Sequence, residues 1–465
     1  MTIRTSHNIN LRKAGALHPF QQSNLFSCCG GVTLGRNIDT GHPVLIDPYR
    51  WKRHGHIGAT IALCLAKING GKTSLAIALA LKLGMLKAAY ERRIRVTLDE
   101  HRRNHGQLEY QRYVDFCGYK YISLHDNPIN MLSPDTGLSR AAMLNMMVET
   151  IEYITKDKLN HYDITVLMVA LAMMFDMTSS TASKEQLLDI IQRLMPKDIN
   201  SFIETEKKPL LRQLQTDSID THLQAIEATA TGEIPWQFSA EERIRQSVQI
   251  DSERLQGSIA KLVFALSRLG KYGDFGGTFG GADSMQGLDQ RVVAVDLTQL
   301  NPATVSLVQS WWWRVKGAAH ESADPLRSFQ LEIHDENHKL WNDPVYQRAM
   351  PAYMKLIRAT GSFLILNSHR PADYDAVAGE GGLLAQNALD EVEVLFLGQQ
   401  SPSVARRVRE RFDLPKSVAE RLPLLGMGQF CLIVGTSSPV YVQIDLTPQM
   451  LELCETNQAN QEMFV

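Results

Sequence analysis

The sequence predicts an α/β fold in which helices cover both faces of a mainly parallel sheet. Three observations support this prediction. Strand-like apolar segments alternate with helical segments along most of the chain. The strand-like segments are almost continuously apolar, as strands buried on both faces are. A long central stretch has helical periodicity, which indicates an all-α insertion into the α/β core.

The first predicted elements form a β-rich N-terminal region. Residues 31–48 contain short apolar stretches separated by Gly and by an Asp-Thr-Gly turn, a pattern typical of a β-meander. The apolar run 59–66 then predicts a core strand, and a helix is predicted from Ser74 onward. Further strands are predicted at residues 93–99, 119–124, 291–297, 328–336, 362–368, 392–398, 428–435 and 439–446.

Apolar residues recur at helical spacing through the middle of the chain, most clearly in residues 138–154, 183–195 and 253–269. The apolar run 164–175 is shorter than the roughly 20 residues that a membrane span requires. We therefore expect a buried helix there and no integral membrane segment. The expected organisation is an N-terminal extension (1–30), a first core part (31–135), an all-helical insertion (136–270), a second core part (271–455) and a C-terminal tail (456–465).

The composition excludes several classes of protein. The 465 residues include 48 Lys and Arg against 50 Asp and Glu, a net charge of −2. This balance excludes a protein that coats nucleic acid or a membrane surface. Six cysteines lack the spacing of a disulfide framework or a zinc site and fit reduced thiols. The first residues contain no apolar run of the signal-peptide type, so we expect a cytoplasmic protein.

Residues 66–73 carry the first candidate motif. The sequence AKINGGKT matches the phosphate-binding loop (P-loop) pattern G-x-x-x-x-G-K-[ST] except at Ala66. It joins a predicted strand to a predicted helix, where backbone N–H groups bind anions. We expect Lys72 to reach the β- and γ-phosphates of ATP and Thr73 to ligate Mg²⁺; a chance Gly-Gly-Lys-Thr turn is the alternative. The predicted nucleotide-binding residues are Ala66, Lys67, Ile68, Asn69, Gly70, Gly71, Lys72, Thr73 and Ser74.

A second motif, Asp335-Glu336, ends the strand predicted at residues 328–336. Asp335 would hold Mg²⁺ through a water, and Glu336 would activate the attacking water as a general base. Taken alone, such a pair is more often a solvated turn; beside a P-loop it predicts a Walker B motif. After the next strand, Ser368 and His369 are placed to sense the γ-phosphate or orient water, with a plain exposed loop as the alternative.

Several sequence blocks, in order, resemble the VirB-type ATPases of conjugation and type IV secretion, in the FtsK–HerA class of P-loop translocases. The blocks are TLGRNIDTGHPVLIDPYR, KINGGKT, TLDEHRRNHGQLEY, GYKYISL, PINML, IHDENHKLW, SHRPAD and LPLLGMGQFCLIVGTSSPVYVQIDLTPQMLEL. Together they cover nearly all of residues 31–455. The resemblance implies a RecA-like, ATP-hydrolysing motor that forms a hexameric homo-oligomeric ring. It also implies other secretion or conjugation components as partners, DNA as a candidate cargo, and a place in the cytoplasm or at the inner face of the cytoplasmic membrane.

The resemblance also assigns individual residues. Arg358 occupies the position of an arginine finger that acts in trans on a neighbour's γ-phosphate; an ordinary exposed helix arginine is the alternative. Asp99 and Glu109 fall in the family's acidic block, with roles that stay open. Asn69 and His369 stand where the family has Gly and Gln, and Ala66 also departs from it.

The sequence is compatible with other functions. Only about 30 residues precede the core, so we expect a motor domain without the family's large N-terminal domain. The rival hypotheses are a double-stranded DNA translocase of the same class, a nucleotide-binding scaffold that does not hydrolyse, and an unrelated P-loop kinase. The substituted residue His369 would suit the scaffold.

Two further clusters have structural and functional interpretations. Residues 311–314, Trp-Trp-Trp-Arg, could stack on nucleotides. Three consecutive residues cannot share one helix face, so we predict core and interface packing instead. Residues 406–412 contain four arginines and could face DNA or a neighbouring subunit; a solvated helix face with i,i+4 pairs is the prediction.

Overall fold

The computed structural model describes residues 31–454 with gaps. The gaps are residues 86–92, 101–102, 105–106, 120, 125–127, 134–135, 178–181, 196–198, 200–251, 271–272, 276, 280–291, 323–327, 337–340, 342, 361 and 376–378. The predicted N-terminal extension 1–30 and C-terminal tail 456–465 lie outside the described residues, as does a large part of the predicted insertion.

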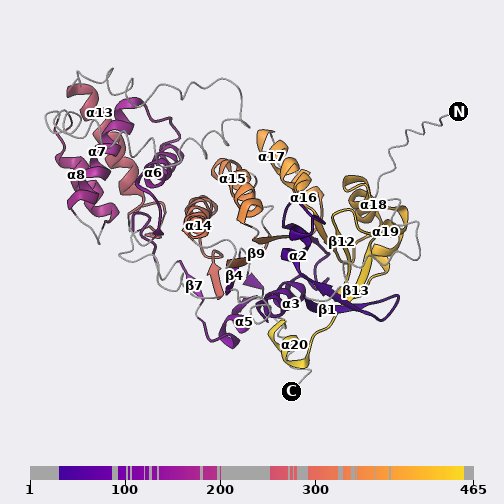
Figure 1. Cartoon of the computed structure of the whole chain (residues 1–465). Helices are drawn as coiled ribbons and strands as arrows, with labels where there is room; N and C mark the ends of the chain where they lie inside the picture. The colour runs from indigo at the N-terminus through magenta and orange to yellow at the C-terminus, as the bar shows by residue number, and fades with distance from the viewer. Residues whose placement is uncertain are drawn as a thin grey trace.

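Eleven strands form one mixed sheet in the order β2-β1-β13-β12-β11-β3-β10-β9-β4-β8-β7 (Figure 1). The seven strands from β11 to β7 run parallel, and the remaining four pair antiparallel. The predicted mainly parallel α/β sheet is thus confirmed. The bounds are β1 Val32–Asn37, β2 Pro43–Ile46, β3 Ile61–Leu65, β4 Arg93–Glu100, β7 Ile122–Ser123, β8 Val292–Asp296, β9 Ser328–His334, β10 Phe363–Ser368, β11 Val394–Leu397, β12 Gln429–Val434 and β13 Val440–Ile444.

The helices connect these strands. Their bounds are α2 Pro48–Arg53, α3 Lys72–Met85, α5 Gln111–Phe116, α6 Arg140–Thr155, α7 His161–Met177, α8 Lys184–Arg193, α13 Ser252–Arg268, α14 Pro302–Ser322, α15 Pro344–Thr360, α16 Ala372–Asp375, α17 Gly379–Asp390, α18 Pro402–Arg411, α19 Lys416–Arg421 and α20 Pro448–Cys454. A two-stranded ribbon that the sequence did not indicate, β5 Arg103–Asn104 with β6 Gln107–Leu108, lies before α5.

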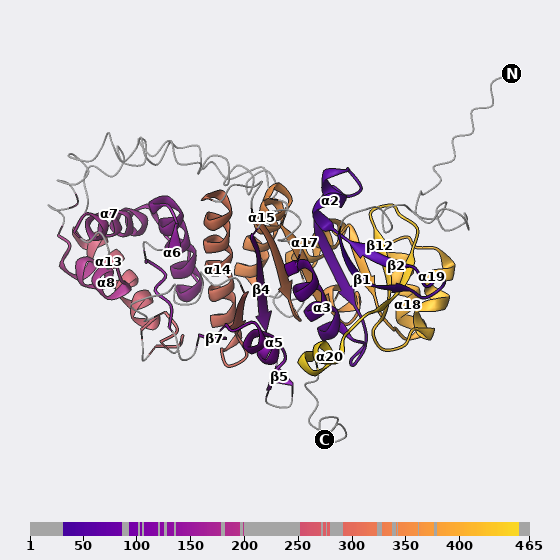
Figure 2. The same ribbon diagram turned by 60° about the horizontal axis from the view of Figure 1, so that its bottom comes forward.

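Alternate strand residues face two helical layers (Figures 1 and 2). In β3, Ile61 and Leu63 join the core shared with α14, α15 and α17, whereas Ala62 and Cys64 join the core shared with α3, α5 and α20. Because successive side chains of a strand point to opposite faces, a continuously apolar strand fits this burial on both sides.

The β-rich N-terminal region pairs with the end of the described chain. β1 and β2 form a hairpin, and β1 pairs with β13 in antiparallel register, with Gly35 opposite Ile444. Gly41, at a φ of 72°, lies in the hairpin turn, and Asn37 Oδ1 accepts the Asp39 N–H at 2.8 Å. The predicted meander therefore forms one edge of the main sheet. The hairpin β12–β13 lies between this edge and the parallel strands.

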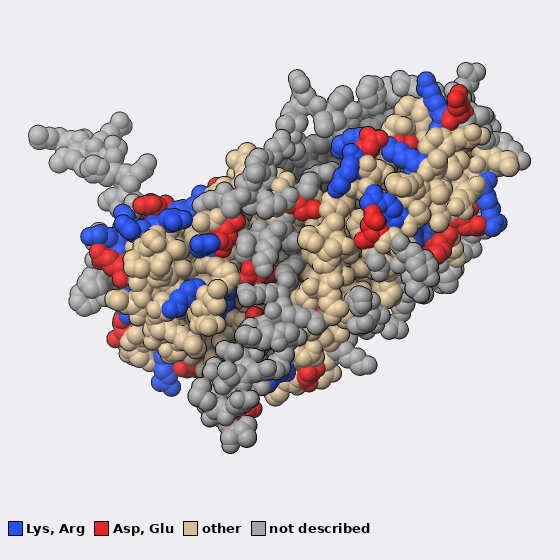
Figure 3. All heavy atoms as spheres, turned by 180° about the vertical axis from the view of Figure 1, so that it is seen from behind, with Lys and Arg blue, Asp and Glu red and all other residues tan. Residues whose placement is uncertain are grey.

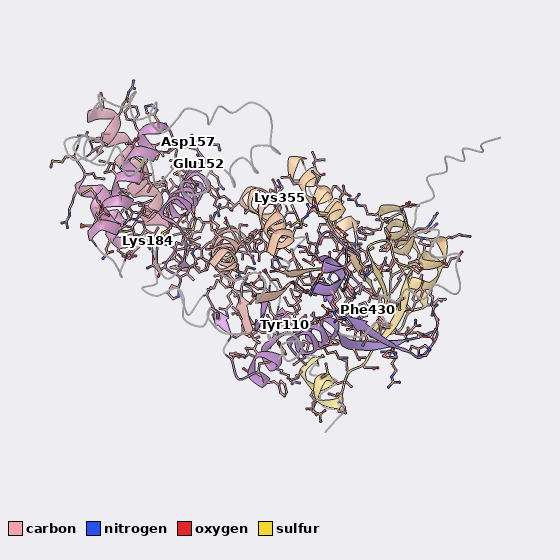
Figure 4. All side chains as sticks on the ribbon, in the orientation of Figure 1. Tyr110, Glu152, Asp157, Lys184, Lys355 and Phe430 are labelled. Carbon is pink, nitrogen blue, oxygen red and sulfur yellow. The ribbon has the colours of Figure 1, made fainter. Side chains whose placement is uncertain are left out.

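The helices α6, α7, α8 and α13 form a bundle to one side of the sheet (Figure 1). Local sequence signals define their starts: Ser139 caps α6, and Ser183 with Gln186 forms a capping box at α8. Within the bundle, Lys261 Nζ lies 2.9 Å from Asp157 Oδ2 and 3.1 Å from Asp163 Oδ2. Asp157 is labelled in Figure 4.

Helix α14 lies between the bundle and the sheet (Figure 2). Arg314 Nη2 contacts Glu149 Oε2 of α6 at 2.5 Å. Trp311, Trp312 and Trp313 are each no more than 3% exposed. A helix covered on several sides buries consecutive residues, so the predicted core packing of the tryptophans is confirmed.

The arginine-rich segment forms α18. Arg406 and Arg407 are exposed, while Arg411 Nη2 contacts Asp390 Oδ1 of α17 at 2.8 Å.

The face of the molecule seen in Figure 3 carries Lys and Arg interspersed with Asp and Glu. Within the described part of the chain, no helix has the length and apolar character needed to cross a membrane.

Candidate active site

The P-loop sequence forms the connection between β3 and α3. Asn69 has a φ of 61° and Gly71 a φ of 89°, a left-handed conformation that glycine adopts freely. A Cβ on Gly70 would lie 2.8 Å from the Lys67 carbonyl oxygen. The loop is therefore a tight turn that depends on its glycines, and its residues 67–69 are exposed.

Ala66, which departs from the P-loop pattern, is fully buried. A Cβ on Gly398 would lie 2.7 Å from Ala66 Cβ, and a Cβ on Gly70 would lie 2.9 Å from it. The alanine methyl thus occupies space that two glycines leave open. It packs at the end of β11, where the Gly398 N–H donates to the Leu65 carbonyl at 2.8 Å.

The side chains of Lys72, His369 and Glu336 form a chain of contacts. Lys72 Nζ lies 2.8 Å from His369 Nδ1 and donates to the Ala66 carbonyl at 3.2 Å. His369 Nε2 lies 2.6 Å from Glu336 Oε1. An ammonium group only donates, so Nδ1 is the acceptor and Nε2 carries the proton that is donated to Glu336. His369 therefore joins the P-loop lysine to the predicted base.

This chain forms where neighbouring strands end. β3, β10 and β9 are adjacent and parallel, and the predicted site residues follow their carboxyl ends. Glu336 is 5% exposed and has a φ of 52°, an unusual conformation for a non-glycine residue. The Asp335 N–H donates to the Asp99 carbonyl at 3.2 Å, which continues the strand pairing up to the motif.

Burial and neighbouring carboxylates together shift the pKa of Asp335. Burial, then Glu109 and then Glu336 raise the pKa of Asp335 to about 7, against the opposing effects of Lys72 and His369. The charges of Glu109 and Glu336, which add to the effect of burial on Asp335, favour a bound cation.

These oxygen donors fit Mg²⁺. Thr73 supplies a hydroxyl and Asp335 a carboxylate, and the Thr73 hydroxyl already donates to Glu109 Oε2 at 2.6 Å. Among the residues that the structure describes, no group of three or more His, Cys, Asp or Glu side chains is arranged to hold a metal by itself. Mg²⁺ at nucleotide sites takes most of its ligands from water and phosphate, so one or two protein oxygens suffice.

The side chains of two predicted residues take no part in this chain of contacts. The Ser368 hydroxyl donates to Asp373 Oδ2 at 3.2 Å, which shapes the loop after β10. Arg358 lies in the last turn of α15, before β10 begins. It is therefore near the amino ends of the parallel strands, whereas the P-loop follows the carboxyl end of β3. Its Nη1 contacts Glu391 Oε2 at 2.8 Å, and its carbonyl accepts a hydrogen bond from Lys52.

Other contacts at the site were not predicted. Gln400 Nε2 donates to the His369 carbonyl at 3.0 Å. Phe430 of β12, labelled in Figure 4, lies 3.8 Å from the position of a Cβ on Gly71 and packs beneath the loop. The sequence places Gln400 and Phe430 after and within strands, but their contacts depend on which strands neighbour β3.

Behind β9, on the α14–α15 face, lies a buried ionic network. Lys316 Nζ contacts Glu332 Oε2 at 2.6 Å and lies 4.0 Å from Asp99 Oδ2. His334 Nε2 lies 3.3 Å from the same Asp99 oxygen, and the Tyr353 hydroxyl donates to Glu332. Lys316, Glu332 and Asp99 are at most 1% exposed. The network packs α14 and α15 onto β9, the strand that Asp335 and Glu336 follow directly.

No protein-family model and no curated protein sequence matches this chain. Among solved structures, the chain is similar to VirB4 of Thermoanaerobacter pseudethanolicus, with a TM-score of 0.61 and 17% sequence identity. The alignment covers 91% of this chain and 98% of that chain. This likeness establishes a VirB4-type fold and confirms the predicted RecA-like α/β architecture.

Proposed function

We propose that this chain is an Mg²⁺-dependent ATPase that serves as a motor of a conjugative DNA-transfer or type IV secretion system. One observation carries the proposal: the predicted nucleotide-site side chains converge at the carboxyl ends of β3, β9 and β10. These side chains are Lys72, Thr73, Asp335, Glu336 and His369. The VirB4-type fold supports the motor assignment at the level of architecture.

Each residue has a proposed role. The loop from Ala66 to Ser74 binds the phosphates through its N–H groups and the N-terminus of α3, and Lys72 contacts the β- and γ-phosphates. Thr73 and Asp335 hold Mg²⁺, which when bound neutralises charge on the phosphate oxygens. Glu336 takes a proton from the attacking water.

His369 is proposed to link phosphate binding to the base. While it accepts from Lys72, its other nitrogen donates to Glu336. When Lys72 turns to a γ-phosphate, His369 loses one of its two partners. Its hydrogen bond to Glu336 remains and holds the base in place for the attacking water.

A ring of identical subunits would complete the site. Arg358 is exposed and lies in the last turn of α15, before β10 begins, whereas the P-loop follows β3, so we assign it to a neighbour's phosphate. In that role it must exchange Glu391 for the phosphate. We propose a hexamer that works in the cytoplasm or at the inner face of the cytoplasmic membrane, with other secretion or conjugation components as partners.

ATP turnover by the wild type, Lys72→Ala and Glu336→Gln tests the proposed function. Both variants should lose at least about a hundredfold in turnover, and Glu336→Gln should still bind ATP. Asp115→Asn removes an exposed carboxylate from α5 and serves as the matched control. Turnover that survives both substitutions would contradict the mechanism.

The same assay separates the rival functions. Stimulation of turnover by double-stranded DNA favours a translocase of the same class. ATP binding without turnover in the assembled wild type favours the scaffold.

A further inference from the structure

Glu109 is an acidic side chain at the site to which the proposed mechanism gives no role. It lies in the turn between β6 and α5, next to Tyr110, whose side chain is fully buried and is labelled in Figure 4. Its Oε2 accepts a hydrogen bond of 2.6 Å from the Thr73 hydroxyl. The contact joins segments 36 residues apart in the sequence, so the fold, and not local geometry, brings Glu109 to Thr73.

The chemistry of this hydrogen bond bears on metal binding. A threonine hydroxyl has one proton and two lone pairs. An ionised carboxylate only accepts, so Glu109 accepts the hydrogen bond of the Thr73 hydroxyl and leaves the lone pairs of Thr73 Oγ1 to a cation. A hydrogen bond to a charged acceptor is stronger than one between neutral groups and holds the hydroxyl in one orientation.

We propose that Glu109 is a positioning residue of the Mg²⁺ site, which orients the Thr73 hydroxyl so that its oxygen faces the metal. This inference rests on the proposed function, because it requires a magnesium nucleotide at the P-loop. Partners of this kind behind a metal ligand change metal affinity by about ten- to a hundredfold when they are removed.

Calorimetric titration of the full chain with ADP, in Mg²⁺ and in EDTA, tests the inference without turnover. The measured quantity is the Mg²⁺ enhancement, the ratio of ADP affinity with Mg²⁺ to that without. Glu109→Ala should reduce the enhancement about ten- to a hundredfold and leave ADP affinity in EDTA unchanged. Asp115→Ala, from the adjacent helix, should match the wild type. A Glu109→Ala protein with the full enhancement, or with equal losses in both buffers, would overturn the inference.

Two further variants sharpen the test. Glu109→Gln keeps an amide oxygen that can accept the hydroxyl proton and should retain more of the enhancement than Glu109→Ala; the reverse order contradicts the inference. In a Thr73→Val background, Glu109→Ala should cause little further loss, because its effect passes through the hydroxyl. A wild type without any Mg²⁺ enhancement would instead contradict the proposed function itself.

Discussion

His369 contacts both the P-loop lysine and the proposed catalytic base. Its two ring nitrogens contact Lys72 at 2.8 Å and Glu336 at 2.6 Å. A glutamine has an oxygen that accepts and a nitrogen that donates, so it can replace both contacts of the neutral imidazole. The imidazole at position 369 can therefore make the same hydrogen-bonding pattern as a glutamine would.

This equivalence predicts different outcomes for two substitutions. His369→Gln should keep turnover within a few-fold of the wild type. His369→Ala should lower kcat by about a hundredfold, because the base is no longer held in place, with a smaller effect on ATP affinity. Steady-state kinetics of both variants measure this. Equal losses in the two variants would show that His369 acts through a property that glutamine lacks.

The buried Asp335 carboxyl makes stability depend on pH. Its pKa is about 7 in the folded chain and near 3.9 when unfolded. Between these values the folded state holds a proton that the unfolded state has lost, so stability falls as pH rises from about 4 to about 7. Asp335→Asn should therefore be more stable than the wild type at pH 8, and the difference should shrink toward pH 4.

Urea unfolding across this range, in EDTA and without nucleotide, measures the difference. The exposed control Asp115→Asn should follow the wild type at every pH. A difference between Asp335→Asn and the wild type that does not vary with pH would refute the linkage.

At the scale of elements, α14 and β9 are joined by the buried Lys316–Glu332 pair. Removing one member of a buried pair leaves an uncompensated charge and destabilises by about 3–5 kcal/mol. Lys316→Met should lower the free energy of unfolding by about this amount. Glu332→Gln in the same chain should recover part of the loss. Urea unfolding at fixed pH gives both values.

Lys416→Ala is the control for this experiment, because Lys416 pairs with Glu420 on the exposed surface of α19. An exposed pair contributes about 0–1 kcal/mol, so a small loss is expected. If the double variant is no more stable than Lys316→Met, the uncompensated Glu332 charge is not the cause.

At the scale of the whole molecule, variants of Arg358 can distinguish catalysis within one subunit from catalysis between two subunits. Arg358→Ala and Glu336→Gln should each be inactive alone. In a mixed ring, the base of one variant meets the arginine of the other, so mixing should restore part of the turnover. ATP turnover against mixing ratio measures this.

Arg411→Ala is the matched control, since Arg411 pairs with Asp390 next to Glu391 and has no proposed role at a phosphate. It should keep turnover near that of the wild type. Turnover that stays at the level of the separate variants at every mixing ratio would contradict an arginine finger in trans.

The sequence by itself predicts the strands of the main sheet, the P-loop and the Asp335-Glu336 motif. These features depend on local pattern: apolar runs, glycine spacing and a strand end. The sequence does not indicate the short ribbon before α5, because two-residue strands carry no periodicity.

Only the tertiary structure brings Glu109 to Thr73, His369 to Lys72 and Glu336, and Lys316 to Glu332. These contacts depend on which strands become neighbours in the sheet, and β3 lies between β10 and β11, both from the distant end of the chain. Strand order follows from burying both faces of the whole sheet at once, a requirement that no local segment expresses.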